Sequence, residues 1–473
     1  MPDRDLCYTP ATELVRLIRR RAVSPLEVTR AVLDRIAQVN PPVNAYCTVA
    51  AEQALADARR ATAALTRSAR PGPLHGVPVS IKDLTPTRGI RTTWGSRIHA
   101  DHVPDRDGLV VERLRAAGAV VIGKTNTPEF GAGANTSNAV FGATRNPWNL
   151  ALTCGGSTGG GAVALALGLA PLAQGSDLGG SLRIPAAFCG VVGFRTSPGL
   201  VPVHPTDLGW DALSVQGPMA RTVADTALIL SVIAGGDPRA PLSFPADVRP
   251  LLAAVRRPGL KGVRIAASED LGVTPVDDDV RRVFREAVIT LRRAGARVDD
   301  AHPDFDGLLE MVLATRGASM VARHEPQFSK WRDVMQDNLV KNIESGLRLS
   351  PVEIGRAERM RTALWHRVRE FQARYELIVT PTVAVPPFPV ETPYPTEING
   401  KPMRSYVEWV LLTYAFTMVG VPAISVPCGF TRTGLPVGLQ IAGRWRDEAG
   451  VLRAAAAFER AAPWAHRRPP DPV

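Results

Sequence analysis

Two serines flanked by glycines lie in one short segment of the 473-residue chain, between positions 155 and 185. Ser157 stands in GGSTGGG and Ser181 follows GSDLGG, and the segment contains no histidine. A serine hydroxyl becomes a nucleophile when a base takes its proton and when donors hold the oxyanion that forms. Glycine permits turns that bring backbone N–H groups toward one point. The segment therefore indicates serine chemistry whose base lies elsewhere in the chain.

Two other interpretations of this segment need motifs that the chain leaves incomplete. A phosphate-binding loop is suggested by GGSTGGG before the apolar run AVALALGLA, because helix N-termini attract anions. Neither GxxxxGK[ST] nor GxGxxG occurs there, however. Residues 155–159 also match the G-x-S-x-G of a nucleophile elbow, which needs an apolar strand directly before it and a histidine and an acid after it. The preceding NPWNLALTC is a poor strand, and this interpretation leaves Ser181 unexplained.

Lys82 is the strongest candidate for the base. It follows the apolar run VPVSI at 77–81, which predicts a buried strand, and it precedes Asp83. Burial lowers the pKa of an amine, so that its neutral form can accept a proton. An ion pair between Lys82 and Asp83 is the alternative, and the local sequence does not decide between the two. Ser181 precedes LRIPAAF, in which Pro185 suits a first helical turn, so backbone N–H groups near it could form an oxyanion hole.

The elements around these residues predict an α/β protein with a large mixed sheet flanked on both faces by helices. Capping boxes at Ser24 and Ser350 predict helices that reach about Val39 and Tyr375, and Thr222 with Asp225 starts another. Short apolar runs predict strands at 77–81, 119–122, 190–194, 263–267, 376–379 and 436–441. Residues 277–298 predict a helix and then a strand. The proline-rich stretch 380–395 is interpreted as a surface excursion or a domain boundary.

Composition and charge exclude several classes of protein. The chain is 45% hydrophobic and 21% charged, which is typical of globular proteins rather than disordered ones. Its net charge of +11 comes from scattered arginines, without a run of five basic residues or a nucleic-acid-binding motif, so no nucleic-acid partner is expected. The five cysteines form no CxxC pair, and the N-terminus lacks a signal-peptide pattern, which together favour a cytoplasmic protein.

One apolar stretch, residues 410–430, is long enough to cross a membrane. Gly420, Pro422 and Pro427 divide it into a helix-like piece and a strand-like piece. We therefore expect no membrane span there, but a buried pocket wall or core.

The motifs taken together resemble those of the amidase signature family. The resemblance lies in HGVPVSIKDL (75–84), CGGSTGGGAVA (154–164), GSDLGGSLRIPAAFCGVVGF (175–194) and GPMARTVAD (217–225), and continues in VGVPAISVPCGF and GLPVGLQIAG. It implies the amidase signature fold in a single domain over residues 1–473. Within that domain it implies an N-terminal helical segment at 1–66, a catalytic core at 67–235, and the rest of the sheet with the pocket helices at 236–473.

The resemblance also implies roles for individual residues, because the family uses a triad of serine, a second serine after a cis peptide bond, and lysine. Ser181 is then the nucleophile, Ser157 relays its proton and Lys82 is the base. The implied oxyanion hole consists of the backbone N–H groups of Leu178, Gly179, Gly180 and Ser181. The implied supporting residues are Gly156, whose bond to Ser157 is cis in the family, Thr158, and the pair Asp177 and Arg183, which would hold the loop.

The implied reaction is amide hydrolysis that needs neither a metal nor a cofactor, with a small-molecule amide as substrate. Residues 195–218 lack the K-P-T-x-G-R-V-S-type run and the D-Q-I-G-P ending of the glutaminase component of tRNA-dependent amidotransferases, so a free-standing amidase is favoured over that alternative. The apolar segment 409–421 is a candidate pocket wall, with 132–138 on another side, which favours an aryl or alkyl amide. An esterase or carbamate hydrolase using the same triad is a further alternative. As to assembly, the protein could form a homodimer.

Overall fold

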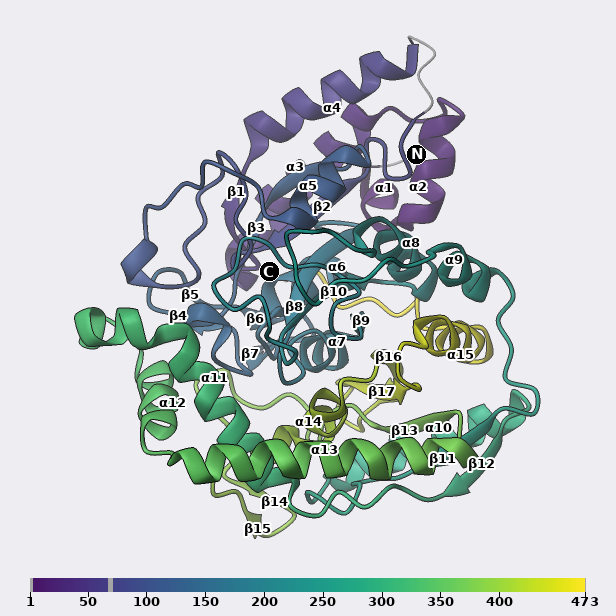
Figure 1. Ribbon diagram of the computed structural model, residues 1–473. Helices are drawn as coiled ribbons and strands as arrows, with labels where there is room; N and C mark the ends of the chain where they lie inside the picture. The colour runs from purple at the N-terminus through teal and green to yellow at the C-terminus, as the bar shows by residue number, and fades with distance from the viewer. Residues whose placement is uncertain (1–2, 67–70, 473) are drawn as a thin grey trace.

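The computed structural model describes residues 3–66 and 71–472 of the chain (Figure 1). Across these residues one mixed sheet contains eleven strands, in the order β1-β3-β2-β8-β10-β9-β16-β17-β13-β11-β12. Parallel pairs join β2 to β3 and β8, and β11 to β12 and β13, whereas the other neighbours are antiparallel. The strands are β1 Tyr46–Val49, β2 Pro78–Lys82, β3 Val120–Thr125, β8 Leu172–Asp177, β9 Val192–Arg195, β10 Val215–Ala220, β11 Arg264–Ala267, β12 Arg297–Asp300, β13 Leu377–Pro381, β16 Ala423–Phe430 and β17 Pro436–Ala442.

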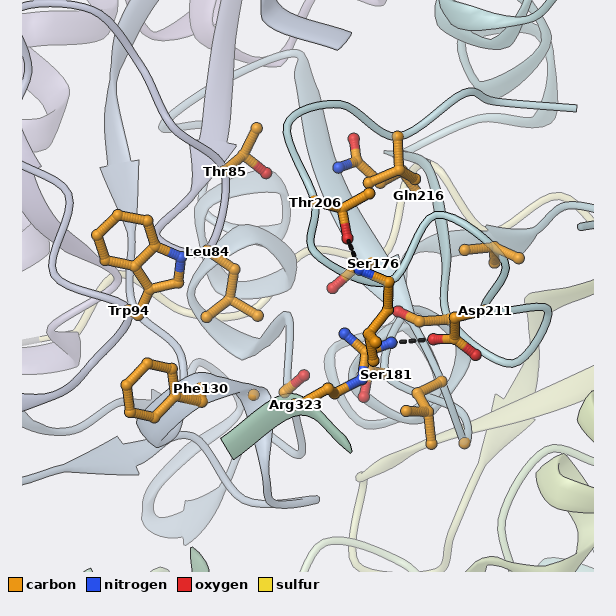
Figure 2. Close-up of a pocket in the computed structure, with 18 of the residues that line it drawn as sticks. Leu84, Thr85, Trp94, Phe130, Ser176, Ser181, Thr206, Asp211, Gln216 and Arg323 are labelled. Carbon is orange, nitrogen blue, oxygen red and sulfur yellow. Dashed lines mark hydrogen bonds and ion pairs between the residues drawn. The ribbon is translucent and has the colours of Figure 1, made fainter. Parts of the chain in front are cut away.

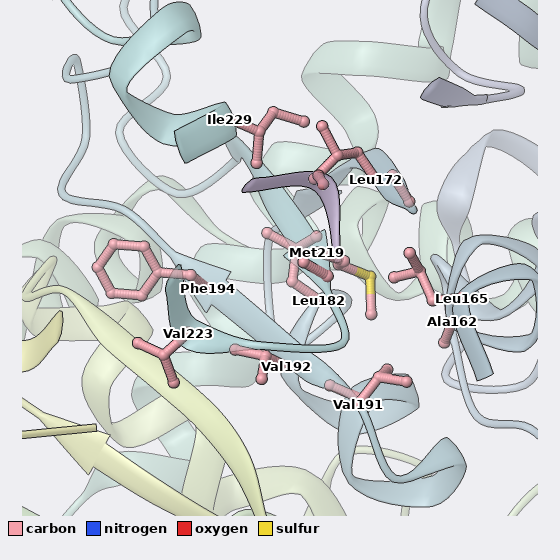
Figure 3. Packing of buried hydrophobic residues seen from close by; sticks show 14 of the residues in the cluster. Ala162, Leu165, Leu172, Leu182, Val191, Val192, Phe194, Met219, Val223 and Ile229 are labelled. Carbon is pink, nitrogen blue, oxygen red and sulfur yellow. The ribbon is translucent and has the colours of Figure 1, made fainter. Parts of the chain in front are cut away.

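Helices cover both faces of this sheet. Gly193 of β9 faces α7, because a Cβ there would approach Leu182 and Ala186, so the next residue, Phe194, points to the opposite face. Figure 3 shows Phe194 beside Val223 of α8. The helices are α1 Asp3–Tyr8, α2 Ala11–Arg19, α3 Pro25–Val43, α4 Ala51–Thr66, α5 Leu109–Ala116, α6 Gly159–Ala166, α7 Arg183–Cys189, α8 Val223–Ile233, α9 Arg249–Arg256, α10 Asp278–Arg293, α11 Leu308–Trp331, α12 Asp337–Leu347, α13 Pro351–Arg374, α14 Leu411–Val419 and α15 Glu448–Ala461.

The glycine-rich segment forms the centre of the molecule. Every residue of α6 and α7 is buried, and α6 packs on β2, β8 and β10 while α7 packs on β9, β16 and β17. A helix that is apolar all round is a core helix, which is what the run AVALALGLA indicates. The long helices α11 and α13 lie together along one side of the molecule and contact α14 (Figure 1). These three helices contribute to a second hydrophobic cluster.

The predicted α/β architecture is confirmed, with three local differences. The helix from Ser24 continues past Val39 to Val43, because Pro41 and Pro42 are compatible with helical φ in its last turn and Asn44 ends it in the left-handed region (φ 53°). Both predicted capping boxes are present. Residues 410–430 divide into α14 and β16 as expected, and no helix within 3–66 or 71–472 is long and apolar enough to cross a membrane.

The second and third differences concern neighbouring segments. The stretch before the first serine loop does form a strand, β7 (Asn149–Thr153), but it pairs with β6 (Arg145–Asn146) in a two-stranded hairpin outside the main sheet. The proline-rich stretch 380–395 is neither a surface excursion nor a boundary at its start, because residues 380–385 are buried. Its later part lies along β7, where Thr153 N–H donates to the Phe388 carbonyl at 2.8 Å. The two segments therefore pair with each other, in addition to the pairing of β7 with β6.

Candidate active site

The predicted catalytic residues meet at one edge of the sheet. β2 and β8 are parallel neighbours, with Ile81 opposite Gln174, so their carboxyl ends open on the same side. Lys82 is the last residue of β2, and Ser176 and Asp177 end β8. The two serine loops precede α6 and α7, with Ser157 in the first and Ser181 in the second. We call the ends of β2, β8 and β9 together with residues 154–158 and 178–183 the catalytic edge.

The Lys82 side chain is fully buried and surrounded by hydroxyl groups. Its Nζ lies 2.7 Å from Ser157 Oγ, 3.0 Å from Thr158 Oγ1 and 3.1 Å from Ser176 Oγ. Removal from water lowers the pKa of Lys82 to about 7, although the charge of Asp177 acts in the opposite direction. The ammonium and the neutral amine are therefore both populated near neutral pH. A lysine in that state can take up and release a proton during a reaction.

The alternative of an ion pair between Lys82 and Asp83 does not occur. The Asp83 carboxylate instead accepts hydrogen bonds from the backbone N–H and the hydroxyl of Thr93, at 3.1 and 2.6 Å. Among the residues with described side chains, no acid lies within ion-pair distance of Lys82. The polar neighbours of Lys82 Nζ are hydroxyl groups, so no ion pair holds Lys82 in its ammonium form.

The loop of Ser157 is held in place by its backbone. The peptide bond between Gly156 and Ser157 is cis. A Cβ at Gly156 would lie 3.0 Å from backbone atoms of Ala134 and Asn135, so a larger residue here would force the neighbouring backbone to shift. Ser157 is 2% exposed, and its hydroxyl reaches a cavity on one side and Lys82 on the other.

The loop of Ser181 is tied to the loop of Ser157 and to Asp177. The Ser181 carbonyl accepts a hydrogen bond from Thr158 N–H at 3.1 Å. The Asp177 carboxylate accepts from the N–H groups of Gly180 at 2.8 Å and Leu182 at 3.2 Å. Gly180 has φ +125°, and a Cβ there would lie 2.5 Å from Thr413 Oγ1, which explains the glycine. Ser181 is half-buried and lines the same cavity as Ser157.

The bond from Gly180 to Asp177 changes the expected oxyanion hole. The sequence prediction includes the N–H groups of Leu178, Gly179, Gly180 and Ser181 as donors. The Gly180 N–H is already engaged by Asp177 Oδ1 and points into the protein. This removes Gly180 from the free donors, and the N–H groups of Leu178, Gly179 and Ser181 remain as candidates.

Asp177 lies between two buried arginines. Arg183 donates from Nε at 3.0 Å and from Nη2 at 2.9 Å, and Arg195 donates from Nη1 at 3.2 Å, and all three side chains are fully buried. Burial alone would raise the pKa of Asp177, but the two guanidinium groups hold this pKa well below its usual range. The sequence prediction included Arg183 and missed Arg195. Its position directly after the buried run GVVGF, like that of Lys82 after VPVSI, is the signal that could have identified it.

Both serines line a cavity of about 460 Å³. Figure 2 shows Ser181 among the residues around it. Leu84, Trp94 and Phe130 line one side of it, and on another side Arg323 forms an ion pair with Asp211. Of the predicted wall 409–421, Val410 and Tyr414 line the cavity, whereas Trp409 packs in the core against Phe388 and Phe188. Of the predicted stretch 132–138, Gly133 and Ala134 contribute.

The sequence prediction missed the contribution of α11. One face of this helix lines the cavity, and we call it the α11 wall: Arg316, Met320, Arg323, His324 and Gln327. These residues recur at helical spacing, but α11 is mixed in polarity and carries no cap signal or motif around them. Its place beside the serines depends on packing against α14, far away in the sequence.

Comparisons with known proteins identify the family of this chain. Residues 27–452 match the family model described as Amidase. The chain is 38% identical over 474 residues to an acylamidase of Rhodococcus erythropolis, covering 100% of this chain and 99% of that protein. It is 36% identical over 489 residues to the A component of the glutamyl-tRNA(Gln) amidotransferase of Moorella thermoacetica, covering 98% and 99%. A crystal structure of a bacterial aryl acylamidase of the amidase signature enzymes matches with a TM-score of 0.89 and 30% identity, covering 97% of both chains.

The family model spans most of the chain, and the relatives match it from end to end. The protein therefore belongs to the amidase signature family and is a hydrolase that acts on non-peptide carbon–nitrogen bonds of linear amides.

Proposed function

We propose that the protein hydrolyses the C–N bond of a carboxamide through an acyl-enzyme on Ser181, with Ser157 and Lys82 as a proton relay. One observation carries this proposal. The buried Lys82 Nζ lies 2.7 Å from Ser157 Oγ, and Ser157 and Ser181 both line the cavity. A base with a pKa of about 7 is matched to proton transfer near neutral pH.

The proposed reaction begins when Ser181 Oγ attacks the amide carbonyl carbon. The Ser181 proton passes to Ser157 Oγ as the Ser157 proton passes to Lys82 Nζ. The N–H groups of Leu178, Gly179 and Ser181 hold the oxyanion of the tetrahedral intermediate. The C–N bond then breaks as Ser157 donates a proton to the leaving nitrogen and regains one from Lys82. Water attacks the resulting ester by the reverse relay, which releases the carboxylate and restores Ser181.

Asp177 has a positioning role in this proposal. Its carboxylate fixes the N–H groups on both sides of Ser181, at Gly180 and Leu182, and Arg183 and Arg195 fix the carboxylate in turn. Because these three buried side chains are joined to one another and to the loop by hydrogen bonds, the loop has one well-defined arrangement. We propose that residues 1–473 act as one amidase domain, since strands from its beginning, middle and end share the sheet that positions this loop.

A small aryl or alkyl amide is the proposed substrate. Leu84, Trp94 and Phe130 give the cavity an apolar and aromatic side that suits such a group. The similarity to an acylamidase and to an aryl acylamidase supports this class. Esters and carbamates present a similar acyl carbon to Ser181, so hydrolysis of an ester or a carbamate is equally compatible with the same triad.

The similarity to the A components of amidotransferases supports a second candidate, the glutaminase component of a tRNA-dependent complex. Residues 195–218 lack the runs of that component, which favours the free-standing enzyme. Size-exclusion chromatography of the native protein with and without host lysate separates the two. Elution unchanged by lysate supports the free-standing enzyme, and a stable complex with a larger chain supports the glutaminase component.

Labelling with a serine-directed fluorophosphonate tests the nucleophile. We expect intact-mass spectrometry to show one adduct, peptide mapping to place it on Ser181, and the Ser181→Ala variant to remain unlabelled. The Lys82→Ala variant should lose the label because its Ser181 lacks a base. An adduct on Ser157 alone would contradict the assignment and favour the nucleophile elbow.

A further inference from the structure

We propose that Arg316 of the α11 wall binds a carboxylate of the substrate, so that the preferred substrates carry an anionic group besides the scissile amide. The proposal rests on the proposed amide hydrolysis and names a substrate class for it. It predicts that the cavity accepts monoamides of dicarboxylic acids or N-acyl amino acids better than their neutral analogues.

The Arg316 guanidinium is buried with one nitrogen unused. Its Nε donates to Asn342 Oδ1 at 2.9 Å and its Nη1 donates to Tyr414 Oη at 2.9 Å. The guanidinium also lies over the Tyr406 ring, 5.3 Å from the ring centroid. Nη2 is buried and has no hydrogen-bond partner among residues 3–66 and 71–472. Arg316 is 6% exposed and lines the cavity, so a group bound in the cavity can supply the acceptor that the described residues do not.

The charge of Arg316 is also uncompensated. No ion pair involving it occurs within the part of the chain that the structure describes, and its polar partners are an amide and a phenol. Burial raises the pKa of Tyr414 to about 12, so the phenol is neutral at pH 7 and supplies no negative charge. A guanidinium remains charged in proteins, and a buried charge without a counter-charge is unfavourable. A carboxylate would satisfy both the charge and the open N–H groups of Nη2.

Tyr414 connects Arg316 to the reacting part of the cavity. A Cβ at Gly179 would lie 2.5 Å from Tyr414 Oη, which shows that this phenol packs directly on the loop of Ser181. The Arg316 guanidinium therefore lies beside the part of the cavity where Tyr414 meets that loop. The neighbouring Arg323 already forms an ion pair with Asp211. Of the two arginines of the α11 wall, Arg316 is therefore the one whose guanidinium is available for an anionic ligand.

The test compares two matched pairs of amides, each with one acidic and one neutral member. Glutaryl 4-nitroanilide and 5-methylhexanoyl 4-nitroanilide place a carboxylate or an isopropyl group on the acyl side. N-benzoylglycine and N-isobutylbenzamide do the same on the amine side. We expect the wild-type enzyme to prefer the acidic member of at least one pair in kcat/KM. The pair that shows the preference identifies the side of the amide that Arg316 recognises.

The Arg316→Met variant should reduce the acidic-over-neutral preference in that pair by about 10- to 100-fold, mainly through KM, because a charge-assisted hydrogen bond is lost. The Arg316→Lys variant should keep part of the preference. Lys330→Met is the matched control, since it removes an exposed cation from the end of α11 and should leave the preference unchanged. Equal loss for acidic and neutral members in Arg316→Met would overturn the proposal, as would a wild-type enzyme without a preference.

A binding measurement keeps this proposal separate from the catalytic one. Calorimetric titration of the Ser181→Ala protein with the acidic member of each pair needs no turnover. Binding that is lost in the Ser181→Ala, Arg316→Met double variant would support the anion site even if no amide were hydrolysed. Binding that is equally strong in both proteins would overturn the anion site even if hydrolysis were found.

Discussion

Arginines are buried both at the catalytic edge and on the α11 wall, but the two regions differ in whether a carboxylate of the chain pairs with the buried guanidinium. At the catalytic edge Arg183 and Arg195 share the carboxylate of Asp177, which in turn fixes the loop of Ser181. On the α11 wall Arg316 is nearly as buried and forms no ion pair in the described part of the chain. The first arrangement fixes reacting groups with charges from the chain itself. In the second arrangement the guanidinium of Arg316 has no counter-charge from the described chain, as expected for a residue that recognises the substrate rather than taking part in the reaction.

The largest effect we predict is at the nucleophile. Replacing Ser181 with alanine should lower kcat/KM by at least about 10⁴-fold, because it removes the group that forms the covalent intermediate. The melting temperature should stay close to that of wild type, since the hydroxyl is half-buried and only its oxygen is removed. Steady-state kinetics and a melting curve on the same preparation check both statements. Retention of most of the activity would remove Ser181 from the mechanism.

Substitution of Lys82, the proposed base, should give the next largest effect and should also change how kcat/KM depends on pH. Because the active form of Lys82 is the neutral amine, kcat/KM should rise with pH through about 7 and fall about tenfold per unit below it. The Lys82→Met variant should lose about 10³-fold or more at neutral pH and should lack this acidic limb. Rates measured from pH 5 to 9 with a neutral amide test this. A flat profile in the wild type over that range would contradict the role of Lys82.

The paired charges of the catalytic edge should matter for stability. Asp177→Asn leaves Arg183 and Arg195 buried without their counter-charge, which should reduce the free energy of unfolding by about 3–5 kcal/mol. Urea denaturation measures this change. Asp247→Asn is the control, because it breaks an exposed ion pair with Arg249 and should have little effect. Similar results for the two variants would show that the buried network is not a stabilising unit.

The smallest effect is expected at Ser176, which the sequence prediction did not include. Its hydroxyl is one of three that accept from Lys82 Nζ. Ser176→Ala should lower the plateau value of kcat/KM by about fivefold, because Lys82 loses one of the three hydroxyl groups that position it. The acidic limb should move to lower pH, because a hydrogen bond that favours the ammonium is lost. The same pH series measures both changes. A shift of the limb to higher pH would contradict the contact as described.

The sequence predicts the catalytic edge better than the α11 wall for a physical reason. Lys82 ends a buried strand, and Ser157 and Ser181 stand in glycine-rich loops before buried helices, so local patterns mark each of them. Whether Gly180 has a free N–H depends on the direction of the Asp177 side chain, which no local pattern reports. The position of Arg316 in the cavity wall depends on its hydrogen bond to Tyr414, 98 residues away, and on the packing of α11 against α14. No local pattern reports either contact.

The same distinction applies to the fold. The main-sheet strands named from apolar runs are present, because a short apolar run between turn residues is already a complete signal for a buried strand. β7 and the proline-rich stretch after β13 were misinterpreted because each is held by the other across more than 200 residues. Patterns of a single segment therefore identify strands with continuous apolar runs. They miss the inner strands β8 and β10, whose sequences LAQGSD and VQGPMA are interrupted by polar residues and glycine, and they describe poorly the segments that pair at the margin of the sheet.

The most direct test of the account is the pKa of Lys82 itself, measured by NMR on protein labelled with ¹³C at the lysine side chains. The chain has six lysines, so the spectrum is sparse, and the Lys82→Met and Lys124→Met variants assign the two buried ones. We predict that the pKa of Lys82 is about 7 and that of Lys124 about 8, whereas an ordinary lysine in water titrates above about 10. A Lys82 resonance that titrates in that ordinary range would contradict its role as the neutral base, and with it the proton relay through Ser157.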